Sequence, residues 1–452
     1  MFSRSWMLFL ALAPLVARAA DPEIKFEKYQ LPNGLTVILS EDHRLPQVAV
    51  DIWYHVGASR QTRGKSGFAH LFEHMMFSGA KHIGPQPFRV LESIGSQGGS
   101  MVNGTTGFDR TNYFETVAAD ELPTALWLES DRMGFLLDTL DENKLKVQRD
   151  VVSNERRQTY ENRPYGTTQL KICDLLYPPP HPYYNCVIGT IAEIQSASMD
   201  DLRAFFRQYY APNNASLAIV GDFDPAQVKP LVEKYFGPIP RVPEVPLNKV
   251  PQPMLTSVVR ERIDDPLAEL PRLTLVWNGV KPYAPDEPAG DLLAAIIGSG
   301  KTSRLYKKLV FEKGVASTAA ALNSTLELGG YFSAFAVAKP GHTTEELLAL
   351  MDEIIADVKK KGVTRDELER ARRKIIAQRL RGVERIGGFG GKADLLNQYQ
   401  TNLGDPGYLP KDIASYRAAT AEAVQAFANK YLASDRRLIL ETVPAKKAVS
   451  VR

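Results

Sequence analysis

The sequence predicts an α+β protein that consists of two homologous domains produced by internal duplication. The chain has 452 residues, 44% of them hydrophobic, which is too long for one ordinary core and suits two domains of about 200 residues each. A proline-rich linker, 240–256, can form neither a helix nor a central strand. We therefore expect an N-terminal domain at 21–239 and a C-terminal domain at 257–452, each a mixed, mostly antiparallel sheet packed with helices.

Matching segments near both ends of the two halves indicate the duplication. Residues 204–211 and 426–433 share an Ala-Phe pair followed by a Tyr-X-Ala triplet, at an offset of 222. Residues 45–50 resemble 270–275 at an offset of 225. Because the offsets at both ends are so close, we interpret the halves as two copies of one α+β unit.

Strand and helix patterns are mixed within the first half. Residues 34–39 and 48–56 alternate or run apolar with β-branched residues, which is typical of strands. Residues 68–77 and 122–140 have helical periodicity, and 142–160 predict a long polar helix. This mixture favours an α+β unit over an all-helical or all-strand one.

Charge and composition exclude nucleic acid as a partner. The formal charge is +3, which provides no strong field toward nucleic acid or an anionic membrane. Basic runs with interleaved aromatic residues, which a nucleic-acid groove needs, are absent from the sequence.

The first twenty residues, 1–20, predict a secretory signal peptide. Arg4 gives a positive start, residues 6–16 are almost wholly apolar, and Ala17-Arg18-Ala19 offers small residues at the cleavage spacing. The apolar run is too short to span a bilayer, and an uncleaved anchor is the alternative. Cleavage removes two arginines and lowers the formal charge from +3 to +1. We expect a periplasmic protein with no stable membrane span.

Two cysteines, Cys173 and Cys186, lie thirteen positions apart across a proline-rich turn. Export would place them where a disulfide can persist. The sequence leaves their pairing open, because it does not give the Cα separation that a disulfide requires. A structural zinc site would need more Cys or His residues nearby.

His70-Leu71-Phe72-Glu73-His74 is the most informative motif. On a helix, residues four apart share one face, so both imidazoles can bind one Zn²⁺ ion. Glu73 lies beside them and can take a proton from an attacking water without binding the metal. The acid precedes the second histidine, which reverses the more common order. The alternative, two surface histidines, fits poorly with so apolar a helix.

A catalytic zinc needs a third protein ligand and an open position. Val151 and Val152 indicate the buried face of the later polar helix, and Glu155 continues that face. An inward carboxylate is costly unless it meets a cation, which favours Glu155. An exposed Glu155 paired with Arg149 or Arg156 is the alternative. Other carboxylates with suitable chemistry are Glu92, Glu115, Glu129 and Glu161.

These segments resemble the pitrilysin family of M16-type metallopeptidases (inverzincins), specifically its two-domain bacterial and mitochondrial-processing type. Residues 56–79, with the histidine motif, look like the family's zinc helix and its lead-in. Residues 151–157 resemble the segment that carries the third ligand. The resemblance covers nearly the whole mature chain. It implies a zinc endopeptidase with three metal ligands and one general base: His70, His74, Glu155 and Glu73.

The resemblance also implies how a substrate binds. The family's two α+β domains form half of a clamshell chamber and face a second pair of domains. Residues 103–106 resemble the start of the edge strand along which substrates lie extended, which implies that Asn103 and Gly104 contact short or unfolded peptides. On local sequence alone, the alternative for Asn103 is a turn-forming residue before glycine.

Two positions depart from the family pattern. Gln148 stands where a Glu is common near the metal, and we expect little loss of activity from that change. Val310 and Ser317 stand where complete assemblies carry an Arg and a Tyr, and neither can donate to a developing oxyanion as those groups do. We therefore expect a heterodimer in which a homologous, metal-free subunit supplies the Arg and Tyr.

Competing interpretations are weaker. Residues 295–302 match a relaxed phosphate-loop pattern, but a helix is predicted before them where a strand is needed. Residues 387–391 are glycine-rich without the context of a dinucleotide site, and we interpret them as a loop, a hinge or a partner surface. A non-catalytic structural or assembly subunit is the alternative function, although such subunits lose metal ligands first. Maturation of one specific peptide, rather than general degradation, is also open.

Overall fold

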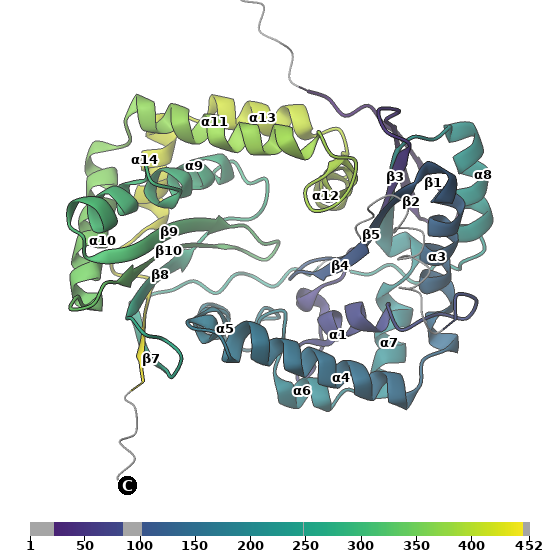
Figure 1. Cartoon of the computed structure of the whole chain (residues 1–452), viewed down its shortest axis with the longest axis horizontal. Coiled ribbons are helices and arrows are strands. Elements are labelled where there is room, and N and C mark those ends of the chain that lie inside the picture. The colour runs from purple at the N-terminus through teal and green to yellow at the C-terminus, as the bar shows by residue number, and fades with distance from the viewer. Residues whose placement is uncertain (1–21, 85–101, 247, 446–452) are drawn as a thin grey trace, which may run out of the picture.

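The structure is a computed structural model that describes residues 22–84, 102–246 and 248–445. The predicted signal peptide at 1–20 lies outside the described residues. Within these ranges, no helix has both the length and the hydropathy that a membrane span requires. Two sheets, each covered by helices, give the molecule two lobes (Figure 1). The predicted α+β class is confirmed.

The N-terminal sheet has six strands in the order β1-β2-β6-β3-β5-β4. The β2–β6 pair is parallel and the other pairs are antiparallel. The strand β4 is therefore an edge strand. The bounds are β1 Glu27–Gln30, β2 Thr36–Glu41, β3 Gln47–Tyr54, β4 Val102–Thr106, β5 Thr111–Ala118 and β6 Ala215–Gly221.

The C-terminal sheet has five strands in the order β7-β11-β8-β10-β9. Its single parallel pair is β7–β11, and β9 is an edge strand. The pattern repeats that of β2-β6-β3-β5-β4, so the duplication is present in the topology as well as in the sequence. The bounds are β7 Val259–Asp265, β8 Arg272–Asn278, β9 Ala316–Ser324, β10 Tyr331–Ala338 and β11 Leu438–Pro444.

The helices from α1 to α7 repeat in the same order as those from α9 to α14, whereas α8 has no counterpart among the described elements. For example, α7 and α14 both begin and end 222 positions apart. In the first half the helices are α1 Phe68–Met75, α3 Leu122–Phe135, α4 Glu142–Arg156, α5 Gly166–Leu176, α6 Ile191–Gln195, α7 Met199–Tyr209 and α8 Pro225–Phe236. In the second half they are α9 Glu287–Gly298, α10 Thr344–Lys361, α11 Arg365–Gly382, α12 Lys392–Leu403, α13 Leu409–Ala418 and α14 Ala421–Tyr431.

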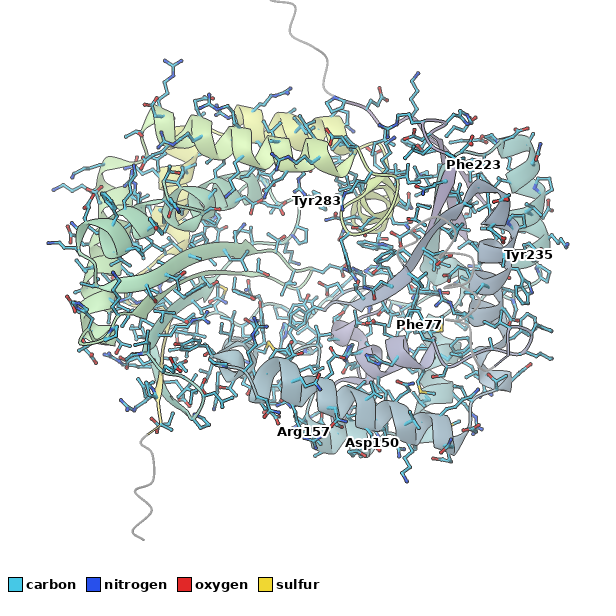
Figure 2. All side chains as sticks on the ribbon, viewed as in Figure 1. Phe77, Asp150, Arg157, Phe223, Tyr235 and Tyr283 are labelled. Carbon is cyan, nitrogen blue, oxygen red and sulfur yellow. A yellow bond between two sulfur atoms is a disulfide. The ribbon has the colours of Figure 1, made fainter. Side chains whose placement is uncertain are left out.

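Each domain covers one sheet face with its own helices and the other face with a helix from its neighbour. In β2, Val37 and Leu39 belong to the N-terminal core, whereas Ile38 packs with Leu396 of α12, because successive residues of a strand face opposite sides. Reciprocally, Leu176 of α5 packs with Leu440 of β11. Figure 2 shows Tyr283 beside α12, where its ring lies 5.9 Å from that of Tyr399. This exchange fixes the two domains against each other.

Two local predictions change in detail. The polar helix is α-helical only to Arg156 and continues as a π-helical turn, Arg157–Glu161. Val152 is buried as predicted, but Val151 is 41% exposed, so the prediction that both valines mark the buried face was wrong. The residues between α8 and β7, which include the predicted linker, form no helix or strand where they are described. The domain boundaries stay a prediction.

Cys173 and Cys186 form a disulfide with a Cα–Cα distance of 5.4 Å. It links α5 to the loop that follows the proline-rich turn. The pairing that the sequence left open is thus present in the structure.

Candidate metal centre

The helix α1 begins at a tight backbone contact. Gly67 precedes it with a φ of +81°, a conformation that favours glycine. A Cβ at Gly67 would lie 2.7 Å from the carbonyl oxygen of Ile188, so the loop before α6 packs directly on the start of α1. His70 and His74, four residues apart, consequently project from one face of a helix that is fixed at its first turn.

Glu155, in the last turn of α4, meets both histidines. Its Oε2 lies 3.2 Å from Nε2 of His74 and 3.5 Å from Nε2 of His70. Zinc bound tetrahedrally at about 2.0–2.1 Å from each ligand separates its ligands by about 3.3 Å, which matches these distances. Asp141 caps the start of α4 by accepting a hydrogen bond from the Lys144 amide at 2.8 Å. Among the described residues, these three form the one cluster of His, Cys, Asp and Glu whose ligand atoms, all within 4.8 Å, could hold a metal.

The charge states of His70 and Glu155 suit a cation. Burial lowers the pKa of His70 to about 4, so its imidazole is neutral at pH 7, as metal binding requires. The hydrogen bond with His74 holds the pKa of Glu155 below its usual range, so that carboxylate is ionised. Nδ1 of His70 is buried without a hydrogen-bond partner. Two imidazoles and one carboxylate are a donor set that zinc uses in catalytic sites.

Glu73 lies next to the cluster but outside it. Its side chain is buried, and its Oε2 accepts a hydrogen bond of 2.6 Å from the Thr106 hydroxyl. Burial raises the pKa of Glu73, which makes it a stronger proton acceptor than an exposed carboxylate. One carboxylate oxygen is thus fixed by Thr106, and the other remains for chemistry.

The edge strand β4 passes directly beside Glu73. A Cβ at Gly104 would lie 3.0 Å from the Phe77 ring and 3.2 Å from Cγ of Glu73, so glycine permits this approach. Figure 2 shows Phe77 between α1 and the sheet. Asn103 is exposed, and its Oδ1 accepts a hydrogen bond from the Gly104 amide at 2.9 Å. The structure therefore brings Gly104 and Thr106 to Glu73 and leaves Asn103 at the sheet edge.

Two residues that sequence reasoning did not single out support the strand. Thr106 orients Glu73. Because residues two apart on a strand share a face, the position of Gly104 could have indicated that Thr106 also faces α1. Arg110 donates to the carbonyl of Thr105 at 2.9 Å and to Oδ1 of Asn112 at 2.8 Å. Its guanidinium also lies 4.9 Å from the Trp53 ring. No short motif indicates Arg110, because its partners come from three strands.

The alternative partners of Glu155 are engaged elsewhere. Arg149 donates to the carbonyl of Ala197, and Arg156 pairs with Glu161 at 2.9 Å. The other candidate third ligands also lie elsewhere. Buried Glu115 and Glu129 lie close to Arg132, and Glu92 lies outside the described residues.

The structure also places the other positions and segments that the sequence analysis singled out. Gln148 donates to the Ser78 hydroxyl at 3.3 Å, close to the end of α1. Val310 packs against the C-terminal core, and Ser317 is exposed on the edge strand β9. The segment 295–302 begins inside α9 and does not follow a strand, which excludes a phosphate loop there. The glycine-rich segment 387–391 is a loop between α11 and α12.

The chain is similar in sequence to known peptidases. Residues 36–171 match the family described as Insulinase (Peptidase family M16), and residues 196–375 match the Peptidase M16 inactive domain. The zinc protease PqqE of Helicobacter pylori is 30% identical over 352 residues, which is 76% of this chain and 77% of that protein. The beta subunit of the mitochondrial-processing peptidase of Saccharomyces cerevisiae is 24% identical over 302 residues, 66% of this chain and 64% of that protein.

The fold is similar to a solved structure. The crystal structure of a protease from Helicobacter pylori superposes with a TM-score of 0.85 and 26% sequence identity, covering 93% of this chain and all of that one. The fold, the converging His, His and Glu donors and the separate carboxylate of Glu73 define a metallopeptidase. The chain belongs to the M16 (insulinase) family and is a zinc metalloprotease.

Proposed function

We propose that this chain is a zinc endopeptidase in which His70, His74 and Glu155 hold the metal and Glu73 is the general base. This proposal rests on the convergence of the three donor atoms and on the place of Glu73, which lies next to them and accepts its hydrogen bond from Thr106. Zinc held by these three residues would supply Lewis acidity toward the scissile carbonyl and a water molecule.

Glu73 performs the proton transfers in this scheme. Its Oε2 is fixed by Thr106, so Oε1 is the atom that takes the proton of the attacking water and passes it to the leaving amine. Burial raises the pKa of Glu73 toward the range in which one carboxylate can both accept and release a proton. Gly104 allows the substrate strand to approach this oxygen closely.

The edge strand β4 supports binding of extended peptides. Its outer side has no neighbouring strand in the described sheet, so a peptide can pair with its main chain. Main-chain pairing tolerates many sequences, and only unfolded or short chains can adopt it. We therefore propose short or unfolded peptides as substrates, with Asn103 and Gly104 in contact with them.

A second, homologous subunit completes the catalytic site in this proposal. Val310 has no side-chain donor, and the short Ser317 hydroxyl does not donate to a developing oxyanion as an Arg and a Tyr do. A relative of this chain, from yeast, is itself named as one subunit of a processing peptidase, which supports the proposal.

The heterodimer is tested by assaying the purified chain alone with an unstructured peptide. We expect weak cleavage, and we expect the double variant Val310→Arg/Ser317→Tyr to gain roughly tenfold in kcat/KM, a fraction of what oxyanion donors contribute. Phe311→Arg, which adds a cation at a neighbouring residue that is 81% exposed, is the matched control and should gain nothing. Full activity of the unmodified chain by itself would contradict the heterodimer.

The proposed location is the periplasm. The signal-like pattern at 1–20 and the disulfide between Cys173 and Cys186 support it, because disulfides persist in oxidising compartments. N-terminal sequencing of protein from the periplasmic fraction should give a chain that begins near Asp21. A chain that retains Met1 in the cytoplasmic fraction would contradict export.

A further inference from the structure

The C-terminal domain contains the counterpart of the metal centre. By element order, α9 corresponds to α1, α11 to α4 and the edge strand β9 to β4. The helix α9 contacts both α11 and β9, as α1 contacts α4 and β4. A cavity of about 490 Å³ lies where these elements meet, and on α9 it is lined by Asp291, Ala294 and Ala295. None of the described residues that line it is a histidine, so the side chains at this position differ in kind from those of the metal centre.

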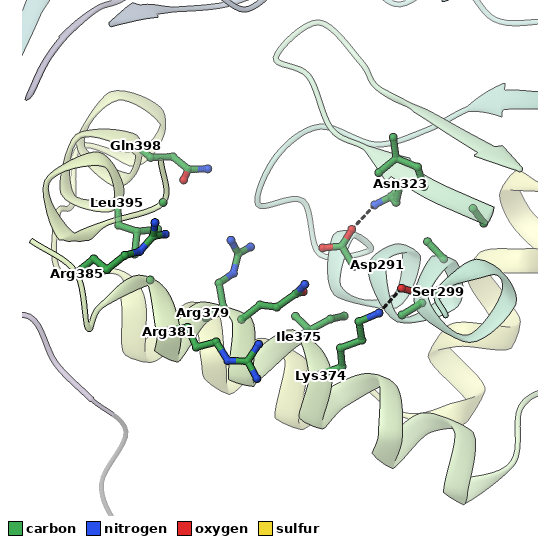
Figure 3. A pocket seen from close by; sticks show the side chains of 17 residues that line it. Asp291, Ser299, Asn323, Lys374, Ile375, Arg379, Arg381, Arg385, Leu395 and Gln398 are labelled. Atoms are coloured by element: carbon green, nitrogen blue, oxygen red, sulfur yellow. Dashed lines mark hydrogen bonds between the residues drawn. The ribbon is translucent and has the colours of Figure 1, made fainter. Parts of the chain in front are cut away.

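Four cationic side chains line this cavity: Lys374, Arg379, Arg381 and Arg385. Figure 3 shows Lys374, Arg379 and Arg385 extending from α11 and the following loop toward α9 and α12. The mature chain is nearly neutral, so four cations around one cavity are a local concentration of positive charge. Such a cavity attracts anions and raises their local concentration.

The carboxylate at the cavity already accepts hydrogen bonds at both of its oxygens. Asp291 is the one carboxylate among the lining residues in the described part of the chain. Its Oδ1 accepts from the Asn323 amide at 2.9 Å and its Oδ2 from the Tyr416 hydroxyl at 2.6 Å. Burial raises the pKa of Asp291, which weakens it further as a counter-charge.

Among the described residues, three of the four cations form no ion pair with a carboxylate, although the charge of Arg385 lowers the pKa of the nearby Asp394. Lys374 donates to the Ser299 hydroxyl, and Arg385 donates to the carbonyl of Phe389 at 2.7 Å. Arg381 has no hydrogen bond or ion pair within the described ranges. Arg379 differs from these three, because its Nε lies 3.2 Å from the Asp412 carboxylate. Lys374, Arg381 and Arg385 therefore retain their capacity for an incoming anion.

Neutral groups at the cavity suit a peptide better than a simple anion. Oδ1 of Asn323 is a buried acceptor without a partner, and a peptide N–H can satisfy it, whereas phosphate at neutral pH offers few donors. The strand β9, which carries Asn323, is an edge strand, so a peptide main chain can pair with it. Arginine side chains, in turn, match the two oxygens of a carboxylate.

The start of α12 lies between the cavity and the edge strand β4 of the N-terminal domain. Gly390 and Leu395 line it, and between them Asp394 accepts a hydrogen bond of 2.7 Å from the Gly390 amide. Burial raises the pKa of Asp394, and the nearby Arg110 guanidinium opposes that rise. Arg110 bonds Thr105 of β4. The start of α12 thus separates the cationic cavity from the strand beside Glu73.

We propose that this cavity is a binding site for peptide carboxylates, which anchors acidic side chains or the C-terminal carboxylate of a substrate away from the metal. The inference rests on the proposed peptidase function for the identity of the ligand. This proposal assigns the C-terminal domain a role in selecting acidic peptides, in place of metal binding, for which its described residues offer no cluster of ligands.

The test measures binding rather than cleavage. A fluorescent, unstructured acidic peptide is titrated into the Glu73→Gln protein, and its anisotropy is compared with that of a peptide whose Asp and Glu are replaced by Asn and Gln. A version with an amidated C-terminus separates the side-chain source of carboxylate from the terminal one. The cavity variant is Lys374→Gln/Arg381→Gln/Arg385→Gln. The control variant, Arg365→Gln/Arg370→Gln/Arg373→Gln, removes the same charge from exposed positions of α11 outside the cavity.

We expect the acidic peptide to bind the Glu73→Gln protein at least tenfold more tightly than the neutral one. The cavity variant should lose that preference, the control variant should keep it, and added salt should weaken it. A preference that survives in the cavity variant, falls equally in the control, or is absent from the start would overturn the proposal.

Inorganic phosphate that displaces the fluorescent peptide as effectively as an unlabelled acidic peptide does would indicate a site for small anions. That result would also contradict the proposal. Circular dichroism melting checks that all variants are folded. Cleavage of a neutral peptide by the unmodified protein is measured separately, so failure of the proposed peptidase function and failure of the cavity remain distinguishable.

Discussion

The N-terminal metal centre and the C-terminal cationic cavity are built from corresponding elements and have opposite chemistry. In the first, α1 and α4 bring two imidazoles and a carboxylate together, a set that attracts a cation. In the second, α9 provides two alanines and an occupied aspartate, while α11 provides cations. In each domain, two helices and an edge strand meet at the same place. The comparison shows that a few side chains on these elements determine whether the place suits a cation or an anion.

Burial acts on the acids of the two regions in similar ways but with different results. In α1, burial raises the pKa of Glu73, whose one hydrogen bond within the described residues runs from the Thr106 hydroxyl to Oε2 and leaves Oε1 without a partner there. In α9, burial and the neighbouring Asp291 raise the pKa of Glu287 to about 7, and both oxygens of Glu287 accept hydrogen bonds, from the Tyr283 amide and the Thr325 hydroxyl. The acid of α1 is available for proton transfer, whereas that of α9 is part of the packing.

The largest expected effect separates these two acids. Glu73→Gln should lower kcat/KM by about 10²–10⁴-fold, because it removes the general base and leaves the metal ligands in place. Glu287→Gln, the matched change on α9, should leave kcat/KM within about twofold. Both values are measured with the same peptide and the same assembly. Equal losses in the two variants would break the comparison.

A smaller effect is expected from the edge strand that passes Glu73. Gly104→Ala places a Cβ 3.2 Å from Cγ of Glu73, so the carboxylate or the strand has to shift by a few tenths of an ångström. We expect kcat to fall roughly tenfold, since small displacements of a catalytic group are costly. Gly107→Ala, whose Cβ meets nothing closer than 3.7 Å, is the control. Unchanged kcat in Gly104→Ala would mean that β4 does not constrain Glu73.

The pH dependence of stability tests the structural role of the acid on α9. Glu287 keeps its proton to about pH 7 in the folded protein, compared with 4.5 as its ordinary pKa, so the folded state binds more protons between these values. Stability should therefore fall as the pH rises from 4.5 to 7, by roughly 3 kcal/mol. Urea unfolding across this range should show a flatter profile for Glu287→Gln. Parallel profiles would contradict the assignment.

The smallest effect is expected where the metal centre departs from the family pattern. Gln148 contacts the Ser78 hydroxyl through a single hydrogen bond of 3.3 Å. Gln148→Glu restores a charge near the end of α1, and we expect kcat/KM to change by less than about threefold, as for other surface substitutions. A change of more than tenfold would show that this position tunes the metal more strongly than its contact indicates.

The sequence predicted the parts of the fold and site that depend on local spacing. The offset between the halves predicted the repeated topology, and the spacing of His70 and His74 predicted a shared helix face. The position of Glu155 required the family resemblance, because one of the two valines used to locate it, Val151, is exposed. Helical periodicity gives a face to within a residue or so, but tertiary packing decides which residue is covered.

Features that depend on tertiary contacts were not predictable. The bond from Thr106 to Glu73 depends on how β4 lies against α1. The cationic cavity joins residues of α9, β9 and α11, and in the sequence Lys374 and Arg381 belong to an ordinary charged helix face. The disulfide was left open because chain separation does not determine a Cα distance.

The most direct test of the account is the zinc content of the purified chain, measured by elemental analysis. We predict about one zinc ion per chain in the unmodified protein and in Glu73→Gln, because Glu73 is not a ligand, and loss of zinc in His74→Ala. Full zinc in His74→Ala, or none in the unmodified protein, would contradict the proposed metal centre and would favour a structural subunit.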